Sequence, residues 1–363
     1  MKVMTILGTR PEIIRLSLII KKLDQLTDQH ILVHTGQNFT YQLSDVFFDE
    51  LKLRKPDYLL HQSKHSLGQQ LGVMFQRLES ILLKEKPDRV LVLGDTNSAL
   101  SAMLVERMGI PVVHMEAGNR CFDRQVPEEI NRRMIDAVAT VNLPYTVNSK
   151  NNLLKEGHHP SRIMVSGNPI YEVIQNYQSA IDQSQILKRL KLIDKDYFLV
   201  TAHRAETVDH QEHLKEIFNA LNDIAETYQK RLICSIHPRT KSKLEKIKDI
   251  QVHPLVEFYE PFGFFDFIKL EQHAFCVLSD SGTVQEECCI FHVPTVTMRN
   301  TTERPETVEC GSNLVSGVKK RRIVESVHVM AGQRRDWECP KGYTDSNVSD
   351  KVVKLILGGL GFV

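Results

Sequence analysis

Short apolar runs alternate with longer amphipathic stretches along almost the whole chain, and this pattern limits the fold more than any other feature. The runs that we expect to form strands cover residues 3–8, 30–36, 89–95, 111–118, 140–147 and 162–169, and then 197–204, 231–238, 252–258, 274–280 and 293–299. Stretches such as 11–26 lie between them and have the apolar spacing of an amphipathic helix. This alternation predicts an α/β fold in which helices cover both faces of parallel sheets.

The expected strands fall into two successive series, so we predict two doubly wound, Rossmann-like domains. A chain of 363 residues also exceeds the roughly 250–300 residues at which a single core stops growing. Turn-forming residues at 167–169 mark the join between the series. We therefore expect a first domain over 1–167, a second over 168–340 and a final helix within 341–363, and the pattern leaves open whether that helix packs back on the first domain.

The composition argues against several classes of function. The 46 basic and 45 acidic side chains leave a formal net charge of +1, whereas proteins that bind nucleic acid or anionic membranes usually carry a basic excess. No apolar run approaches the roughly 20 residues of a membrane span, and the first residues lack the features of a signal peptide. The seven cysteines form no CxxC pair, which favours a reducing compartment. We expect a cytoplasmic protein that binds neither nucleic acid nor membrane.

Ligands of doubly wound sheets bind beyond the carboxyl ends of the strands, and the first expected strand ends in LGTRPEIIR. Gly8 allows a tight turn, Pro11 suits the first turn of a helix, and free amides at such a helix start can hold an anion. Arg10 and Arg15 add guanidinium groups, which bind phosphate oxygens. The alternative is an ordinary turn with solvated arginines, because the motif is short and lacks a three-glycine fingerprint.

Three carboxylates lie where two strands end and a helix begins. Asp95 follows the run RVLVLG, Glu116 follows PVVHM, and Glu128 opens the helical stretch PEEINRR. Structural explanations exist, since Asp95 could cap a helix and a helix start favours ionised Glu128 and Glu129. Neighbouring strands would nevertheless bring Asp95 and Glu116 into one crevice, where the pKa values of clustered carboxylates separate, as acid–base catalysis requires. The cations that could hold these acids are Arg120, Arg132 and Arg133.

The second series of strands has polar endings of its own. His203 and Arg204 end one expected strand, and His237 and Arg239 end the next. Histidine can exchange protons near neutral pH, although a single histidine at a strand end is more often structural.

The stretch LSDSGTVQEE predicts a strand, a turn and a helix. Ser281, Gly282 and Thr283 could wrap a phosphate at the helix start, and Glu287 could accept hydrogen bonds from ribose hydroxyls. The aromatic stretch 258–267 offers a flat face to a base, but core packing explains it as well. No residues have the spacing of a metal site, and no dinucleotide, kinase or nucleophile-elbow motif occurs.

Seven motifs in a fixed order point to one family. They are GTRPE at 8–12, GDTNSA at 94–99, HMEAG at 114–118, PEEINR at 127–132, HR-x-E at 203–206, SDSG-x-x-QEE at 279–287 and TTERPE at 301–306. With these motifs the chain resembles the non-hydrolysing UDP-N-acetylglucosamine 2-epimerases over essentially its whole length. The resemblance implies two Rossmann-like domains facing across a cleft, as in many nucleotide-sugar glycosyltransferases, with UDP held mainly by the second. It also implies a UDP-N-acetyl sugar substrate, no cofactor and a homodimer.

The resemblance also assigns roles to single residues. It gives a catalytic set of Asp95, Glu116, Glu128 and His203. It gives nucleotide contacts at Arg10, His237, Ser281, Gly282 and Glu287, with Phe267 against uracil. The analysis of strand ends adds further substrate-binding candidates, which are Arg15, Arg132, Arg204, Arg239 and Thr283. Arg15 stands where the family often has lysine.

Three stretches depart from the family pattern. Thr283 replaces a glycine of SDSGG, and TGQNFTYQ at 35–42 replaces the stretch through which some members are activated by a second substrate molecule. EAGNRCFDRQVPEE resembles a branch that converts UDP-2-acetamido-2,6-dideoxy-L-talose into UDP-N-acetyl-L-fucosamine for capsule or O-antigen assembly. We favour that substrate over UDP-N-acetylglucosamine.

The chemistry that the resemblance implies suits clustered carboxylates and cations. The proton on C2 of an N-acetylhexosamine is poorly acidic, so loss of UDP from C1 must accompany its removal and leave a 2-acetamidoglycal. Return of a proton to the other face and re-addition of UDP give the epimer without a redox cofactor. The alternatives are a UDP-sugar glycosyltransferase, a hydrolysing epimerase and a non-catalytic nucleotide-sugar sensor.

Overall fold

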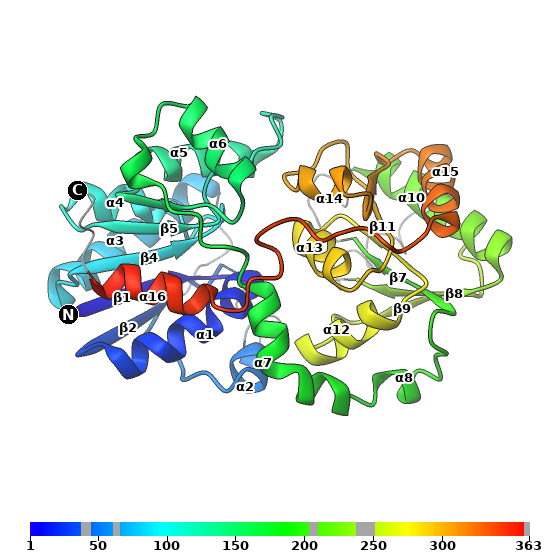
Figure 1. Ribbon diagram of the computed structural model, residues 1–363, viewed down its shortest axis with the longest axis horizontal. Helices are drawn as coiled ribbons and strands as arrows, with labels where there is room; N and C mark the ends of the chain where they lie inside the picture. Colours follow the sequence, from blue (N-terminus) through cyan, green and yellow to red (C-terminus); the bar gives the residue numbers. More distant parts are fainter. Residues whose placement is uncertain (38–44, 61–65, 203–209, 237–250, 359–363) are drawn as a thin grey trace. The chain divides into compact units, whose positions relative to one another are not determined.

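The computed structural model describes residues 1–37, 45–60, 66–202, 210–236 and 251–358 (Figure 1). The chain forms two compact units, one made of Met1–Asn176 with Lys341–Val363 and one made of Tyr177–Pro340. The division falls within helix α7 (Ile170–Gln183) and not at the expected join near residue 167. The returning tail explains the difference, because Glu172 of α7 accepts hydrogen bonds from the amide and the hydroxyl of Ser349, at 2.7 and 2.5 Å.

The first unit is built on a six-stranded parallel sheet with the strand order β3-β2-β1-β4-β5-β6. Its strands are β1 (Lys2–Leu7), β2 (Gln29–His34), β3 (Tyr58–Leu59), β4 (Arg89–Leu93), β5 (Val112–Met115) and β6 (Val141–Leu143). Its helices, besides the first part of α7, are α1 (Arg10–Leu26), α2 (Asp45–Glu50), α3 (Leu67–Glu85), α4 (Ser101–Arg107), α5 (Pro127–Val138), α6 (Val147–Lys155), the short η2 (Pro160–Arg162) and α16 (Val348–Gly358).

The second unit repeats this plan with the order β12-β11-β10-β7-β8-β9, again parallel. Its strands are β7 (Tyr197–Thr201), β8 (Arg231–Ser235), β9 (Val256–Tyr259), β10 (Cys276–Ser279), β11 (Thr295–Thr297) and β12 (Asn313–Val315). Its helices are α8 (Ile186–Arg189), α10 (Gln211–Tyr228), α12 (Phe264–His273), α13 (Gly282–Ile290), α14 (Pro305–Glu309) and α15 (Lys320–Gly332).

Both sheets follow the 3-2-1-4-5-6 order of a Rossmann fold, so the predicted pair of doubly wound α/β units is confirmed. In such a sheet the strand order reverses beside the first strand, and the ligand crevice opens there. The reversal falls between β1 and β4 in the first unit and between β7 and β10 in the second. These are the strands whose ends carry the predicted motifs.

Helices cover both faces of the second sheet, and alternate side chains of β7 pack against opposite layers of helices. Phe198 and Val200 pack with residues of α10 and α15, whereas Tyr197 and Leu199 pack with residues of α12 and α13. Side chains of a strand alternate between faces, so a strand covered on both sides must be apolar throughout. This is why β7 reads as a continuous run, YFLVT.

The structure differs from the predicted strands at three places. Residues 162–169 form no strand, and the segment makes only an isolated bridge between Asn142 and Ile163. Pro160 starts the short η2 helix and Gly167 has a φ of +86°, which breaks the extended run. The two short strands β3 and β12, at the opposite edges of their sheets, were not expected.

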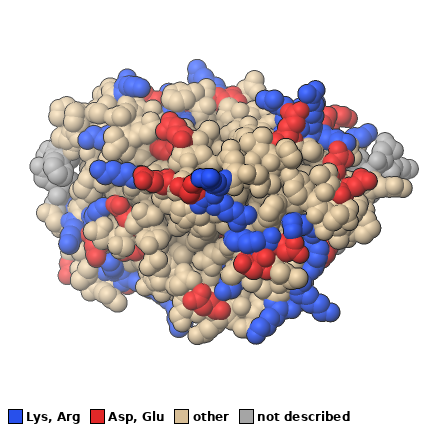
Figure 2. Space-filling model, turned by 45° about the vertical axis from the view of Figure 1, so that its right-hand side comes forward, with Lys and Arg blue, Asp and Glu red and all other residues tan. Residues whose placement is uncertain are grey.

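The C-terminal helix α16 packs on α1 within the first unit, where the two lie side by side (Figure 1). Lys22 of α1 forms an ion pair with Asp350 of α16 at 2.6 Å. None of the helices in the described residues combines the length and apolar character that a membrane span requires. Figure 2 shows basic and acidic side chains interspersed over the face that it presents, in keeping with a net charge of +1.

Candidate active site

The carboxyl ends of β1, β4 and β5 lie next to one another in the first sheet, as the sequence predicted. Leu93 pairs with Met115 at the end of the β4–β5 ladder, and the Gly94 amide continues it with a 3.0 Å bond to the Met115 carbonyl. Gly94 and Glu116 then turn the chain away with φ values of +75° and +67°. A left-handed conformation is costly for a residue other than glycine, so the fold holds Glu116 in a strained position.

Glu116 is held by a buried arginine. Arg15, in the second turn of α1, reaches the Glu116 carboxylate with an Nη1–Oε2 distance of 2.5 Å. The exposed fractions of the two side chains are only 2% and 10%. The Arg15 guanidinium also lies over the Tyr145 ring, 5.6 Å from its centroid. Arg15 is therefore a partner of Glu116, and its expected contact with the substrate stays a prediction.

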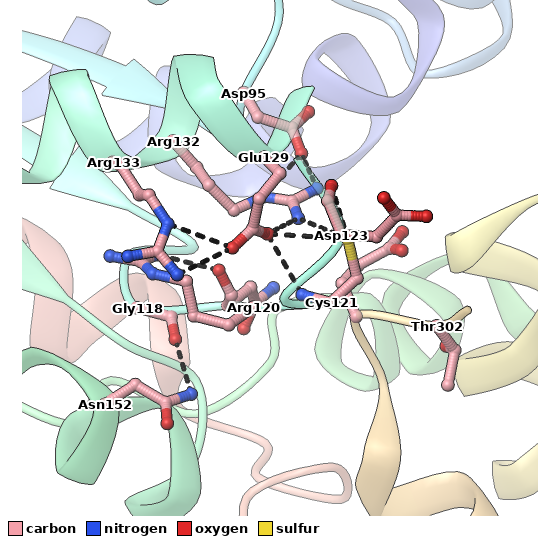
Figure 3. A network of polar contacts seen from close by, with 12 residues as sticks. Asp95, Gly118, Arg120, Cys121, Asp123, Glu129, Arg132, Arg133, Asn152 and Thr302 are labelled. Atoms are coloured by element: carbon pink, nitrogen blue, oxygen red, sulfur yellow. Dashed lines mark hydrogen bonds and ion pairs between the residues drawn. The ribbon is translucent and has the colours of Figure 1, made fainter. Parts of the chain in front are cut away.

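Asp95 is held in the same way by Arg132 of α5 (Figure 3). The Nε and Nη2 atoms of Arg132 lie 3.2 and 2.6 Å from one Asp95 oxygen. Asn131 fixes the backbone with a 2.9 Å bond to the Asp95 carbonyl. The Asp95 side chain keeps an exposed fraction of 24%, whereas that of Arg132 is 2%. The carboxylate is thus paired yet open to a ligand.

The start of α5 places Glu128 and Glu129 differently, although they are adjacent. Glu129 is fully buried and accepts from Arg132, Arg133 and the Cys121 amide (Figure 3). Burial opposes its ionisation, but the Cys121 amide and Arg132 together hold the pKa of Glu129 below its ordinary value. Glu128 stays half-buried. Arg132 and Arg133 reach Glu129 because they lie three and four residues further along the same helix.

A buried ion cluster contacts the segment that connects β5 to α5. Asp136, fully buried on α5, lies 2.9 Å from Nδ1 of His114 and 2.7 Å from Nη2 of Arg120, and accepts from the Gly118 amide at 3.1 Å. Burial opposes ionisation of Asp136, but contacts with His114 and Arg120 hold its pKa below the ordinary value. Arg120 also pairs with Glu156 at 2.5 Å. Sequence reasoning missed Asp136 and His114 because their partners lie far apart in the chain.

Glu12 is another residue that sequence reasoning missed. Its Oε2 accepts from the Gly8 amide at 3.0 Å and from the amide and hydroxyl of Thr9 at 2.7 Å each, and its Oε1 accepts from the Thr96 hydroxyl at 2.9 Å. Burial raises the pKa of Glu12 to about 7 against the opposing effect of these donors. The Thr9–Glu12 spacing of a capping box was the available signal.

The contacts of Glu12 bear on the anion site that was expected in the turn between β1 and α1. The sequence suggested that free amides at the start of α1 would hold an anion, but the Gly8 and Thr9 amides already donate to Glu12. These two amides are therefore occupied, and a contact of Arg10 with phosphate stays a prediction. Gly8 itself is required, because an added Cβ would lie 2.1 Å from the Thr35 hydroxyl and 2.2 Å from that of Ser98.

In the second unit, the turn after β10 has the predicted form of a strand, a turn and a helix. The Ser281 amide is fixed by the Ser279 hydroxyl at 2.9 Å, and the Ser281 and Thr283 hydroxyls lie 3.1 Å apart. Gly282 is the first residue of α13, and a Cβ there would lie 2.5 Å from Oε1 of Glu303. The close approach explains why a glycine stands at this position.

A hydrogen-bonded network supports the turn from α13. Gln285 donates to the Ser281 carbonyl at 3.2 Å and accepts from Thr302 and Asn313 at 2.6 and 3.0 Å. Glu287 is buried on the same helix. Phe267 is partly buried and packs on the core beside β7, so its use by a base stays a prediction.

Four candidates, His203, Arg204, His237 and Arg239, lie outside the described residues. Among the residues that are described, no group of three or more His, Cys, Asp or Glu is arranged to hold a metal ion.

Comparison with known proteins identifies the family. Residues 21–357 match the sequence profile described as UDP-N-acetylglucosamine 2-epimerase. The chain belongs to this family. It is 42% identical over 366 residues to the UDP-N-acetylglucosamine 2-epimerase of Methanocaldococcus jannaschii, covering 99% of this chain and all of that one. It is 38% identical over 337 residues to the UDP-2,3-diacetamido-2,3-dideoxy-D-glucuronate 2-epimerase of Pseudomonas aeruginosa, covering 92% and 93% of the two chains.

Solved structures agree with this membership of the 2-epimerase family. The chain superposes on the M. jannaschii UDP-GlcNAc 2-epimerase, crystallised with UDP-GlcNAc and UDP, with a TM-score of 0.93 at 40% identity, covering 99% of this chain and 100% of that one. The glycosyltransferase WaaG matches with a TM-score of 0.61 at 13% identity, which shows a shared fold alone. Since proteins named in this way are isomerases, the chain is an epimerase.

Proposed function

We propose that this epimerase inverts carbon 2 of a UDP-N-acetylhexosamine by eliminating UDP to a 2-acetamidoglycal and adding it back. The observation that supports this most strongly is the arrangement of two carboxylates at neighbouring strand ends, each paired with its own buried arginine. Arg15 and Arg132 place a positive charge against the carboxylates of Glu116 and Asp95. A carboxylate positioned in this way can act as a base.

The reaction needs acid–base groups on both faces of the sugar ring. One group must take the C2 proton and another must return a proton to the opposite face. We assign these steps to Asp95, Glu116 and Glu128, of which Asp95 and Glu128 remain partly exposed. The proposal adds His203 as the group that contacts or protonates the departing diphosphate.

The leaving group needs stabilisation of its negative charge. We propose that the turn at Ser281, Gly282 and Thr283 binds the diphosphate, since the start of α13 directs amides and a positive dipole end toward an anion. Glu287 would then accept from the ribose hydroxyls. We also propose Arg10 as a cation that binds the diphosphate.

For the substrate we propose UDP-2-acetamido-2,6-dideoxy-L-talose, with UDP-N-acetyl-L-fucosamine as the product. The support is the stretch EAGNRCFDRQVPEE, which connects Glu116 to Glu128. UDP-N-acetylglucosamine is the second candidate, because the M. jannaschii relative carries that substrate in its name.

One incubation tests the proposed reaction against its alternatives. The enzyme is mixed in D2O with UDP-N-acetyl-L-fucosamine or UDP-N-acetylglucosamine (UDP-GlcNAc), and carbon 2 of the sugar is followed by NMR. The proposal predicts deuterium at C2 of an intact UDP-sugar together with its epimer. Release of free sugar indicates a hydrolysing enzyme. Absence of exchange with either sugar excludes the proposal and favours a glycosyltransferase or a nucleotide-sugar sensor.

The same assay decides the substrate. We expect kcat/KM for the 6-deoxy-L-sugar to exceed that for UDP-GlcNAc. The opposite order, with C2 exchange intact, would keep the reaction and transfer the assignment to UDP-GlcNAc.

A further inference from the structure

Three cysteines from separate segments of the second unit lie close together. Cys289 lies near the end of α13, Cys310 directly follows α14, and Cys339 lies close to the end of the unit. The Sγ atoms of Cys289 and Cys310 are 3.7 Å apart. Sγ of Cys339 lies 3.6 Å from the Cys289 carbonyl. Two sulfur atoms are thus in van der Waals contact, with a third thiol beside them.

The cluster differs from the other buried thiols of the chain in its accessibility. Cys310 and Cys339 are partly exposed, whereas Cys234, Cys276 and Cys288 are fully buried. Burial raises the pKa of those three thiols, to about 12 in the case of Cys276. A buried thiol with a raised pKa reacts poorly with an oxidant in solution, because the thiolate is the reactive form. Cys289 is also buried, but its sulfur needs to reach only the sulfur of Cys310 beside it.

Cys310 has the opposite electrostatic surroundings. The Cys289 thiol beside it lowers the pKa of Cys310 below the ordinary value of a thiol, and the Ser312 hydroxyl, 3.4 Å away, adds to the effect. Partial exposure and a stabilised thiolate are the two conditions for reaction with an electrophilic oxidant.

We infer that Cys310 is a site of oxidation by hydroperoxides and that Cys289 resolves the product into a Cys289–Cys310 disulfide. The Cys310 thiolate attacks one oxygen of H2O2, forms a sulfenic acid and releases hydroxide. The Cys289 sulfur then attacks the Cys310 sulfur and displaces its hydroxyl group, which leaves as water after taking the Cys289 proton. The two thiols lose two electrons, which reduce one peroxide to two molecules of water.

The geometry allows the second step with a small movement. A disulfide has an S–S length of about 2.05 Å, so the two sulfurs, now 3.7 Å apart, must approach each other by less than 2 Å. Cys310 directly follows the five-residue helix α14 and precedes Gly311, which gives the segment freedom to adjust. The described residues contain no cluster arranged for a metal ion, so thiol chemistry is the use that these contacts support.

Peptide mapping after peroxide treatment tests the inference. Reduced full-length enzyme, freed of reductant, is treated with one equivalent of H2O2, alkylated with iodoacetamide and digested with trypsin. Cys289, Cys310 and Cys339 then fall in different peptides, 270–299, 300–319 and 336–341. We expect a disulfide between 270–299 and 300–319. No disulfide between these peptides in the folded enzyme, or a principal link to 336–341, would overturn the inference.

Variants identify the two sulfurs. Cys288→Ser, the matched control next to Cys289, should keep the disulfide, and Cys310→Ser should lose it. Cys289→Ser should instead accumulate the Cys310 sulfenic acid, which dimedone traps as a stable adduct. A disulfide that survives Cys289→Ser, or a dimedone adduct that forms first on another cysteine, contradicts the inference. Circular dichroism of each variant shows that the protein remains folded.

Discussion

Arg15 of α1 binds the carboxylate of Glu116 at 2.5 Å, although 100 residues lie between them in the chain. The pair spans from the first helix to the turn after β5, and both side chains are largely buried. Glu116 keeps a left-handed backbone with a φ of +67° in this position. We infer that Arg15 acts on the reaction by orienting the carboxylate of Glu116 and balancing its charge.

Removing the charge of Arg15 should therefore damage both stability and activity. Breaking a buried ion pair by removing one partner costs about 3–5 kcal/mol, so Arg15→Gln should lower the free energy of unfolding by that amount and abolish epimerisation. Arg15→Lys keeps the charge and is the matched control, which should retain more of both properties. Urea unfolding and the C2 exchange assay measure the two effects. Equal losses in both variants would argue against an electrostatic role.

Glu12 should make stability depend on pH. Its pKa is raised by burial from 4.5 to about 7, so the folded state binds a proton more tightly than the unfolded state. The wild type should lose stability as pH rises from about 4.5 to about 7, by roughly 3 kcal/mol at 1.36 kcal/mol per pKa unit. Glu12→Gln resembles the protonated form and should not show this loss. A stability difference between wild type and variant that stays constant from pH 4 to pH 8 would contradict the assignment.

Gly282 should be required for nucleotide binding. A Cβ at this position would lie 2.5 Å from the Glu303 carboxylate, which is buried and held by Arg299 at 2.9 Å, so it cannot move aside cheaply. Gly282→Ala should raise the Kd for UDP at least about tenfold, or about 1.4 kcal/mol. Gly332→Ala is the control, since a Cβ there meets no atom within 4 Å. Calorimetric titration with UDP compares the two, and equal affinities would count against the assignment.

Asp136 should be a major contributor to the stability of the first unit. Its carboxylate compensates Arg120 in a fully buried position, so Asp136→Asn should cost about 3–5 kcal/mol. The control is Asp350→Asn, which removes the more exposed pair with Lys22 and should cost less than about 1 kcal/mol. Urea unfolding of both variants provides the comparison. Similar costs would show that the buried cluster contributes no more than a surface pair.

The sequence predicted most strands because their buried faces leave continuous apolar runs. It could not predict β3 and β12, which have two and three residues and occupy sheet edges. It also suggested a strand at 162–169, because this segment contains an apolar run, but Gly167 has a φ of +86° and interrupts the extended backbone. Local composition cannot distinguish a buried turn of this kind from a strand.

The residues of the candidate site also include some that the sequence could predict and some that it could not. Asp95 and Glu116 could be predicted because each directly follows an apolar run, and the strand order then makes them neighbours. The partners of Glu116 and Asp136 could not, because Arg15 and His114 lie on other elements and only the folded sheet brings them together. Glu12 was within reach through its spacing from Thr9, but its bond to Thr96 was not.

The central claim is that carboxylates of the first unit move the proton on C2. Its most direct test is the rate of C2 deuterium exchange in D2O for Asp95→Asn, Glu116→Gln and Glu128→Gln, with the Kd for UDP measured on the same samples. General acid–base groups contribute about 10²–10⁴ to a rate. We predict that exchange falls by such a factor in at least two of the variants while the Kd for UDP changes less than about twofold. Exchange near the wild-type rate in all three would contradict the account.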